Sequence, residues 1–161
     1  MVAQGRALGV EMPLLGSVLG INRSQPAELL TILRRHKPDL EKLPVTVLGL
    51  AFKPGTDDLR ESPAFLIVRE LLSAGAAVTV FDPVAKPVGH AGLRGVTLAE
   101  SLEDALRTAL VVIHVTKWPE FEKLGTLLHK MGLDPLVLDG RRNLMPADFE
   151  HYEGVGRRMV S

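Results

Sequence analysis

The chain of 161 residues contains no cysteine. This absence excludes disulfides, thiolate metal sites and a cysteine nucleophile within the sequence. An excess of one charge is also missing, because nineteen lysines and arginines balance nineteen aspartates and glutamates. A neutral chain has no overall field that attracts nucleic acid or an anionic membrane, although it can still hold a local basic site. No apolar run approaches the length of a membrane span, and the first residues do not form a signal peptide. We therefore expect a cytoplasmic location with no nucleic-acid or membrane partner.

Two common phosphate-binding fingerprints are absent as well. Gly49 follows an apolar run, but the next residues are Leu-Ala-Phe-Lys, so the first βα turn lacks G-x-G-x-x-G. The close backbone approach to a dinucleotide pyrophosphate is therefore not set up there. No Lys-Ser/Thr follows a G-x-x-x-x-G spacing, which excludes a P-loop. We expect no NAD bound by this chain in the usual way.

The residues that are present describe a folded protein, with 46% hydrophobic and 24% charged residues. The length suits one domain of ordinary size plus an appendage. From Pro13 to about Arg35 apolar residues recur with helical spacing, and Pro26 either begins a second helix or kinks a single one. Residues 36–44 are polar and carry two prolines, so they form a connector. We divide the chain into a helical segment with its connector, 1–43, and a second domain, 44–161.

Strands and helices alternate along the second domain. Apolar runs predict strands at 45–51, 77–81, 109–115 and 135–138, and the tail from Tyr152 can add an edge strand. Helical patterns occupy 63–74, 98–107 and 119–131. Strands that alternate with helices of this length build parallel sheets with right-handed crossovers. The sequence therefore predicts an α/β fold, a Rossmann-like doubly wound parallel sheet preceded by an N-terminal helical segment.

Cationic residues follow three of the expected strands. They are Lys53, Lys117, Arg141 and Arg142. The carboxyl ends of parallel strands lie along one edge of a sheet, which is where open α/β sheets bind ligands. A diphosphate suits such an edge, because arginine forms forked hydrogen bonds to phosphate oxygens and lysine acts as a point charge. For Lys117 and Arg142, a solvated surface cation is an equally good interpretation.

The acidic pair Asp57-Asp58 lies in the polar loop after the first strand. A metal or acid/base role is rejected, because adjacent side chains diverge and no further ligand is evident nearby. We expect one of them to bond backbone amides of its own loop or to pair with Arg60. Ser62, directly before Pro63, has the chemistry of a helix N-cap.

Three further residues invite a functional interpretation. Asp82 ends the second strand, where a Rossmann acid would hold a ribose hydroxyl. His114 lies within an apolar strand and is expected to be a hydrogen-bonded core residue, since the histidines show no ligand spacing. Trp118 either walls a ligand pocket or packs the start of the following helix, and we favour packing.

Five motifs in chain order resemble the C-terminal domain of the UDP-glucose dehydrogenase family, whose members include GDP-mannose and UDP-N-acetylmannosamine dehydrogenases. They are G-L-A-F-K-P-G-T-D-D-L-R-E-S-P at 49–63, Phe81-Asp-Pro, Thr116-Lys-Trp-Pro-Glu-Phe, Asp139-Gly-Arg, and Gly154-x-Gly-Arg157. One short motif can arise by chance, but five in order cannot easily do so. Within the family, the first motif is most similar to the UDP-glucose branch.

The resemblance implies an enzyme that oxidises the primary alcohol of a nucleotide sugar to a carboxylate with two NAD. Such enzymes have an N-terminal NAD domain, a central helical dimerisation region and a C-terminal nucleotide-sugar domain. This chain resembles the end of the second part and all of the third. NAD would therefore be bound by a domain outside the chain, as would the catalytic cysteine, and the chain alone would be inactive. The N-terminal helix would mediate a homodimer.

The resemblance also implies which residues contact the nucleotide sugar. They map to Phe52, Lys53 and Arg141, while the adjacent Arg142 makes the last assignment ambiguous. Phe52 is nearly as well explained as a core residue at a strand end. Two alternatives stay open: a nucleotide-sugar-binding module that catalyses nothing, and an interaction protein that dimerises through the helix at 13–33 and has a vestigial pocket.

Overall fold

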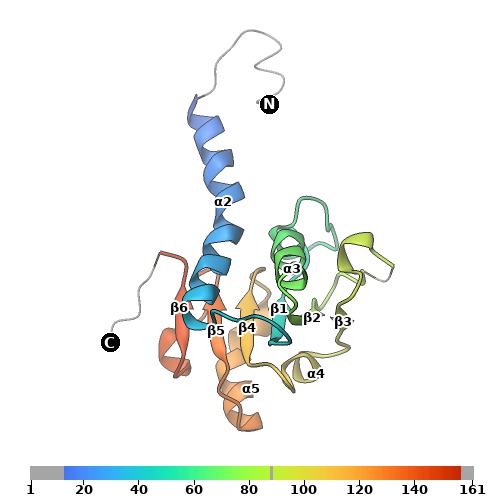
Figure 1. The fold of residues 1–161 in the computed structure, drawn as a ribbon, viewed down its shortest axis with the longest axis vertical. Helices are drawn as coiled ribbons and strands as arrows, with labels where there is room; N and C mark the ends of the chain where they lie inside the picture. The colour runs from blue at the N-terminus through green and yellow to red at the C-terminus, as the bar shows by residue number, and fades with distance from the viewer. Residues whose placement is uncertain (1–12, 88, 157–161) are drawn as a thin grey trace.

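A computed structural model describes residues 13–87 and 89–156 (Figure 1). Its centre is a six-stranded sheet in which every neighbouring pair is parallel, with the order β3-β2-β1-β4-β5-β6. This order is that of the doubly wound dinucleotide-binding fold, and it confirms the expected fold class. The strands are β1 (Pro44–Leu48), β2 (Ala77–Phe81), β3 (Thr97–Leu98), β4 (Val111–His114), β5 (Leu136–Asp139) and β6 (Tyr152–Gly154).

Helices cover both faces of the sheet. One face carries α2 (Pro13–His36) and α3 (Pro63–Ser73), and the other carries α4 (Leu102–Leu106) and α5 (Leu124–Met131). Short 3₁₀ turns occupy 91–93, 119–123 and 146–148. Helix α3 buries four residues at helical spacing, Ala64, Ile67, Val68 and Leu71. Its N-cap is Ser62, as expected, whose hydroxyl accepts a hydrogen bond from the Ala64 amide at 3.3 Å.

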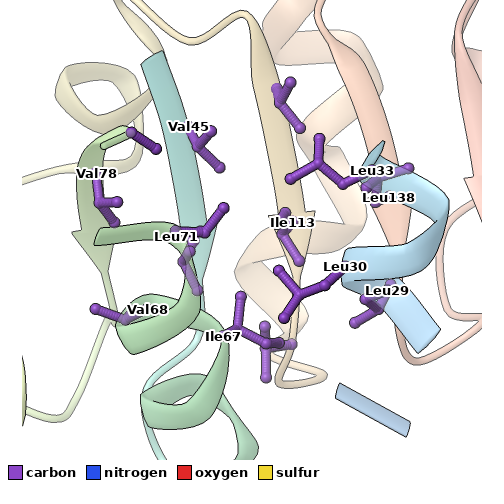
Figure 2. Close-up of a cluster of buried hydrophobic side chains, with 14 of the residues drawn as sticks. Leu29, Leu30, Leu33, Val45, Ile67, Val68, Leu71, Val78, Ile113 and Leu138 are labelled. Carbon is purple, nitrogen blue, oxygen red and sulfur yellow. The ribbon is translucent and has the colours of Figure 1, made fainter. Parts of the chain in front are cut away.

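Helix α2 is continuous through Pro26, which settles the choice that the sequence left open. Its carboxyl-terminal half packs on the sheet, where Leu29, Leu30 and Leu33 face Ile113 and Leu138 (Figure 2). Its amino-terminal half rises beyond the carboxyl ends of the strands (Figure 1). The second half of α2 thus belongs to the same core as residues 44–156, and the division at 43/44 stays a prediction.

A buried carboxylate joins α2 to the edge of the sheet. Glu153 on β6 is 6% exposed and accepts hydrogen bonds from Arg35 Nη2 at 2.6 Å and from His36 Nε2 at 2.7 Å. Because Arg35 lies in the last turn of α2, its charge also complements the negative end of the helix dipole. Among the helices of residues 13–87 and 89–156, none is both long enough and apolar enough to span a bilayer.

Several expected boundaries were wrong for local reasons. The first strand ends at Leu48 and not at residue 51, because Gly49 adopts a φ of 92° and turns the chain. Residues 97–98 form β3 beside β2 instead of starting a helix, and α4 begins only after Ser101, whose side chain caps it. The helix expected at 119–131 splits into a 3₁₀ turn and α5. Arg157, the end of the last motif, lies outside the described residues.

Candidate functional site

The loops after β1 and β4 meet at the point where the strand order reverses. Gly49 is required there: a Cβ on it would lie 2.5 Å from the Cβ of Thr116. The hydroxyl of Thr116 donates to the carbonyl of Ala51 at 2.7 Å. The reversal between β1 and β4 is the topological switch point, outside which open α/β sheets bind ligands. Close packing of the two loops gives this edge a fixed shape.

Asp82, at the end of β2, is engaged by the protein itself. Its carboxylate is buried and accepts hydrogen bonds from five groups, namely the amides of Leu50, Ala51, Val84 and Ala85 and the indole Nε1 of Trp118. A carboxylate with these partners has little capacity left for a ribose hydroxyl. The same contacts confirm that Trp118 packs the structure, since it is 6% exposed.

The loop after β1 displays Phe52 and Lys53 at the surface. The Phe52 amide donates to the carbonyl of Asp58 at 2.8 Å, which closes the loop. Phe52 is 47% exposed, so its interpretation as a core residue was wrong. Lys53 is exposed in the turn that Pro54 and Gly55 form. Two consecutive residues therefore expose an apolar ring and an ammonium group at the carboxyl edge of the sheet.

Asp58 and Arg60 hold the far end of this loop. Asp58 Oδ1 accepts from the amide and the Nε of Arg60, both at 3.0 Å, and Oδ2 accepts from Nη2 at 2.8 Å. These bonds from Arg60 lower the pKa of Asp58 to about 2. The expected pairing of one aspartate with Arg60 is confirmed for Asp58.

Asp139, at the end of β5, organises the second loop of the site. It is fully buried and accepts from His114 Nδ1, from the amides of Arg141, Asn143 and Leu144, and from the hydroxyl of Tyr152, at 2.8 to 3.0 Å. Burial alone would raise the pKa of Asp139. The hydrogen bonds from His114 and from the amides of Leu144 and Arg141 nevertheless hold that pKa well below its usual range. Asp139 is therefore an ionised centre for the loop at 140–144.

Arg141 extends from this loop over the end of β4. Its Nε donates to the carbonyl of Val115. Among residues 13–87 and 89–156, no hydrogen bond or ion pair is recorded for its two terminal nitrogens. Partial burial lowers the pKa of Arg141, and the nearby Asp139 opposes that shift, but a guanidinium stays charged at neutral pH. Arg141 thus offers a half-anchored cation with two N–H₂ groups at the sheet edge.

Arg142 lies in a different position. Its backbone has a φ of 51°, in the left-handed region. Its Nε donates to the carbonyl of Val155 at 2.8 Å, just past β6. The two adjacent arginines therefore point in opposite directions along the sheet. Arg141 contacts the end of β4, and Arg142 contacts the residue after β6.

Three of the four expected contact residues thus lie at the carboxyl edge, on the loops after β1 and β5, the strands on either side of β4. Phe52 and Lys53 follow β1, and Arg141 reaches the end of β4, the neighbour of β1. Lys117 follows β4 and is exposed. An ammonium and a forked guanidinium on one edge can bind a diphosphate, and an exposed aromatic ring can stack on a base or sugar. Sequence reasoning found His114 as a core residue but missed its partner Asp139, because the two lie 25 residues apart.

A second group of polar residues lies away from this edge. Asp134, Glu150 and His151 precede β5 and β6, and their ligand atoms lie within 4.8 Å of one another. All three are exposed, and His151 Nε2 lies 3.4 Å from Asp134 Oδ2. A cavity of about 230 Å³ between α5 and residues 146–150 lies beside them, and no strand-end cation lines it. Surface groups of this kind commonly occur without a metal ion, so we assign none here.

Comparisons with known proteins match most of the chain to one protein family. Residues 46–146 match the family described as UDP-glucose/GDP-mannose dehydrogenase family, UDP binding domain. The UDP-glucose 6-dehydrogenase AglM of Haloferax volcanii is 39% identical over 155 residues, which cover 96% of this chain and 36% of that protein. The UDP-glucose 6-dehydrogenase of Pseudomonas aeruginosa is 37% identical over 129 residues, or 70% of this chain and 27% of that protein.

Solved structures give the same result. A UDP-glucose dehydrogenase from Pyrobaculum islandicum superposes with a TM-score of 0.80 at 36% identity, over 98% of this chain and 35% of that one. A UDP-D-ManNAc dehydrogenase from Pyrococcus horikoshii has a TM-score of 0.64 at 28% identity, over 84% of this chain and 31% of that one. The chain therefore spans about a third of the length of the relatives it matches.

Proposed function

Since this chain belongs to the UDP-glucose/GDP-mannose dehydrogenase family, in which it matches the UDP binding domain, we propose that it binds the nucleoside diphosphate part of a nucleotide sugar. The site is the carboxyl edge between β1, β4 and β5. Arg141 and Lys53 bind the diphosphate, and Phe52 packs against the base or the sugar. Arg142, which bonds the Val155 carbonyl, contributes less than Arg141.

One observation supports this proposal above the others. Arg141 is fixed at its backbone by Asp139 and at its Nε by Val115, while its terminal nitrogens have no recorded partner among residues 13–87 and 89–156. A planar guanidinium that is held at one end is already oriented to receive two phosphate oxygens. The arrangement reduces the ordering cost that binding would otherwise carry.

For the whole protein we propose an NAD-dependent oxidation of the sugar's primary alcohol to a carboxylate, with UDP-glucose as the substrate. Two NAD accept the two hydrides, and one water supplies the second carboxylate oxygen. A cysteine thiolate would carry the intermediate acyl group. This chain has no cysteine, and its Asp82 is engaged by five N–H groups, so both that cysteine and the NAD site belong to parts outside the chain. The role of this chain is to hold the nucleotide so that the sugar is aligned for reaction.

The proposal includes a homodimer in the cytoplasm. The amino-terminal half of α2 extends beyond the carboxyl ends of the strands and away from the sheet (Figure 1). The alternative interaction protein would also dimerise through this helix but would bind no nucleotide.

Calorimetric titration of the chain with UDP-glucose, UDP, GDP-mannose and NAD tests the proposal. We expect saturable binding of the two UDP ligands. Arg141→Ala should weaken it about 10- to 100-fold, since it removes charge-assisted hydrogen bonds of about 1.5–3 kcal/mol. Lys53→Ala should weaken it about tenfold by the same reasoning. Lys130→Ala, an exposed cation in the last turn of α5, is the matched control and should have no effect.

The outcomes separate the alternatives. Binding of NAD without UDP would overturn the domain assignment. Stronger binding of GDP-mannose would move the substrate to that branch of the family. Absence of any nucleotide binding, together with concentration-dependent association, would favour the interaction protein.

A further inference from the structure

His114 and Asp139 form a buried pair beneath the proposed phosphate site. They are register partners at the ends of β4 and β5, and both are 0% exposed. His114 Nδ1 lies 3.0 Å from Asp139 Oδ1, and Nε2 lies 3.0 Å from the carbonyl oxygen of Thr116. The ring of Phe121 meets the imidazole edge to face, with centroids 5.7 Å apart. Both ring nitrogens and one face or edge of the imidazole are therefore in contact with the protein.

The acceptors around the ring determine where its hydrogens lie. A carbonyl oxygen only accepts, so Nε2 must carry a hydrogen to bond Thr116. Asp139 already accepts from three amides and from the Tyr152 hydroxyl, as an ionised carboxylate does. A lone pair on Nδ1 would then face a carboxylate oxygen at 3.0 Å. Both ring nitrogens of His114 therefore face hydrogen-bond acceptors, with Nδ1 directed at Asp139 and Nε2 at the Thr116 carbonyl.

This pair touches both anchors of Arg141. Asp139 Oδ1, which receives His114 Nδ1, also receives the Arg141 amide at 2.8 Å. The Arg141 Nε donates to the carbonyl of Val115, the residue that follows His114. A displacement of His114 therefore moves the acceptors at both ends of the arginine.

We propose that His114 is a positioning residue: through Asp139 and the end of β4, it holds the Arg141 guanidinium in the orientation that receives the diphosphate. The proposal rests on the proposed function, in which Arg141 binds the phosphates. Without His114, Arg141 keeps its charge but loses its fixed orientation, so more conformational entropy is lost when the ligand binds.

Two amide substitutions separate positioning from simple packing. In His114→Asn the side-chain nitrogen takes the place of Nδ1 and still donates to Asp139. In His114→Gln the nitrogen takes the place of Nε2, and the bond to Asp139 is lost. Affinities for UDP and for uridine are measured by calorimetry on the whole chain, with thermal unfolding as the check of folding. We expect His114→Gln to weaken the affinity for UDP about tenfold and to leave the affinity for uridine unchanged. His114→Asn should bind UDP as tightly as the unsubstituted chain does.

The double variant with Arg141→Ala tests whether the effect passes through that arginine. If it does, His114→Gln has no further effect on UDP affinity once Arg141 is alanine. Additive losses, or equal losses for UDP and uridine, overturn the positioning role and leave a structural one. If Arg141→Ala itself leaves UDP affinity unchanged, the proposed function fails. If Arg141→Ala weakens UDP but His114→Gln does not, only the present inference fails.

Nitrogen NMR decides the inference without any ligand. In the unsubstituted chain, both His114 ring nitrogens should show attached hydrogens. The Arg141 Nε–H signal should be protected from solvent exchange and should lose that protection in His114→Gln. An unprotonated Nδ1, or an Arg141 signal that the substitution leaves unchanged, overturns the positioning role of His114. This result does not depend on UDP binding. A chain that binds no UDP contradicts the proposed function and leaves the NMR test of His114 valid.

Discussion

Replacement of Asp139 by asparagine should be the most informative single change in this protein. The carboxylate accepts from His114, from three amides and from Tyr152. An asparagine keeps one acceptor oxygen and presents an NH₂ group on the other side. The least costly orientation directs the NH₂ toward His114, because a neutral imidazole can accept at Nδ1. The Arg141 amide then faces an N–H donor and loses its acceptor.

The magnitude follows from these losses. A buried donor left without an acceptor costs about 1–3 kcal/mol, and breaking a buried ion pair costs about 3–5 kcal/mol when one charge is left unpaired. Since a neutral imidazole can accept from the new NH₂ group, no unpaired charge needs to remain, and we expect Asp139→Asn to lower the free energy of unfolding by about 3 kcal/mol. For a domain of this size, the melting temperature should fall by roughly 6–12 °C.

Urea unfolding followed by circular dichroism and by fluorescence of the single tryptophan measures this loss. Asp134→Asn is the matched control, because that exposed carboxylate lies just before the same strand and its contact with His151 is on the surface. The control should remain within about 0.5 kcal/mol of the unsubstituted chain. An Asp139→Asn variant that also stays within that range would refute the role of Asp139 as an ionised centre.

The same carboxylate gives a pH prediction with a defined sign. The pKa of Asp139 is lower in the folded chain than in the unfolded chain: burial raises it, but the bonds from His114 and the loop amides outweigh burial. Its ionised form therefore stabilises the fold above the unfolded pKa of about 3.9, and this contribution is lost as the pH falls through the lowered folded pKa. Carbon NMR should show no titration of the Asp139 carboxyl between about pH 7 and about pH 4. A midpoint at or above the ordinary aspartate value would contradict the assignment.

Two further substitutions test the frame around the site. Gly49→Ala places a Cβ 2.5 Å from that of Thr116 at a φ of 92°, and should lower the free energy of unfolding by about 3 kcal/mol. Gly55→Ala, with a φ of 79° and open space around the new Cβ, is the control and should lower it by only about 1 kcal/mol. Equal losses would mean that the structure relieves the clash at Gly49. Glu153→Gln removes the carboxylate charge that contacts Arg35 and His36 at the end of α2, and should lower the free energy of unfolding by about 1–2 kcal/mol in urea unfolding. An unchanged midpoint would show that these contacts do not stabilise the fold.

The sheet was predictable because its strands are buried on both faces and therefore appear as apolar runs. β1, β2, β4 and β5 each lie within or close to a predicted strand. β3 was missed because it has two residues, both exposed, and so carries no hydrophobic pattern. The path of α2 through Pro26 was also undetermined, because a proline near the middle of a helix is compatible with a kink, a break or a continuous helix.

The candidate site was predictable to the level of strand ends. The rule that ligands bind at the carboxyl edge of a parallel sheet gives four candidate cations from the sequence, Lys53, Lys117, Arg141 and Arg142, and only the family resemblance narrows them to Lys53 and Arg141. The rule cannot separate Arg141 from Arg142, because that difference depends on the backbone, where Arg142 adopts a φ of 51° and turns toward Val155. Nor can it pair His114 with Asp139, since their contact requires the register of β4 against β5.

The two strand-end aspartates explain how a neutral chain presents a cationic edge. Backbone amides of the following loops surround Asp82 and Asp139, and both carboxylates are buried. In a dinucleotide-binding fold, the acid after β2 faces outward to a ribose. Here the carboxylates are directed into the protein, whereas Lys53 and Arg141 remain at the surface. The loop amides bond the two carboxylates inside the protein, so these two negative charges are withdrawn from the surface of this edge and the cations stay there. That arrangement is the physical basis on which we propose a diphosphate, and not a ribose diol, as the ligand at this place in the fold.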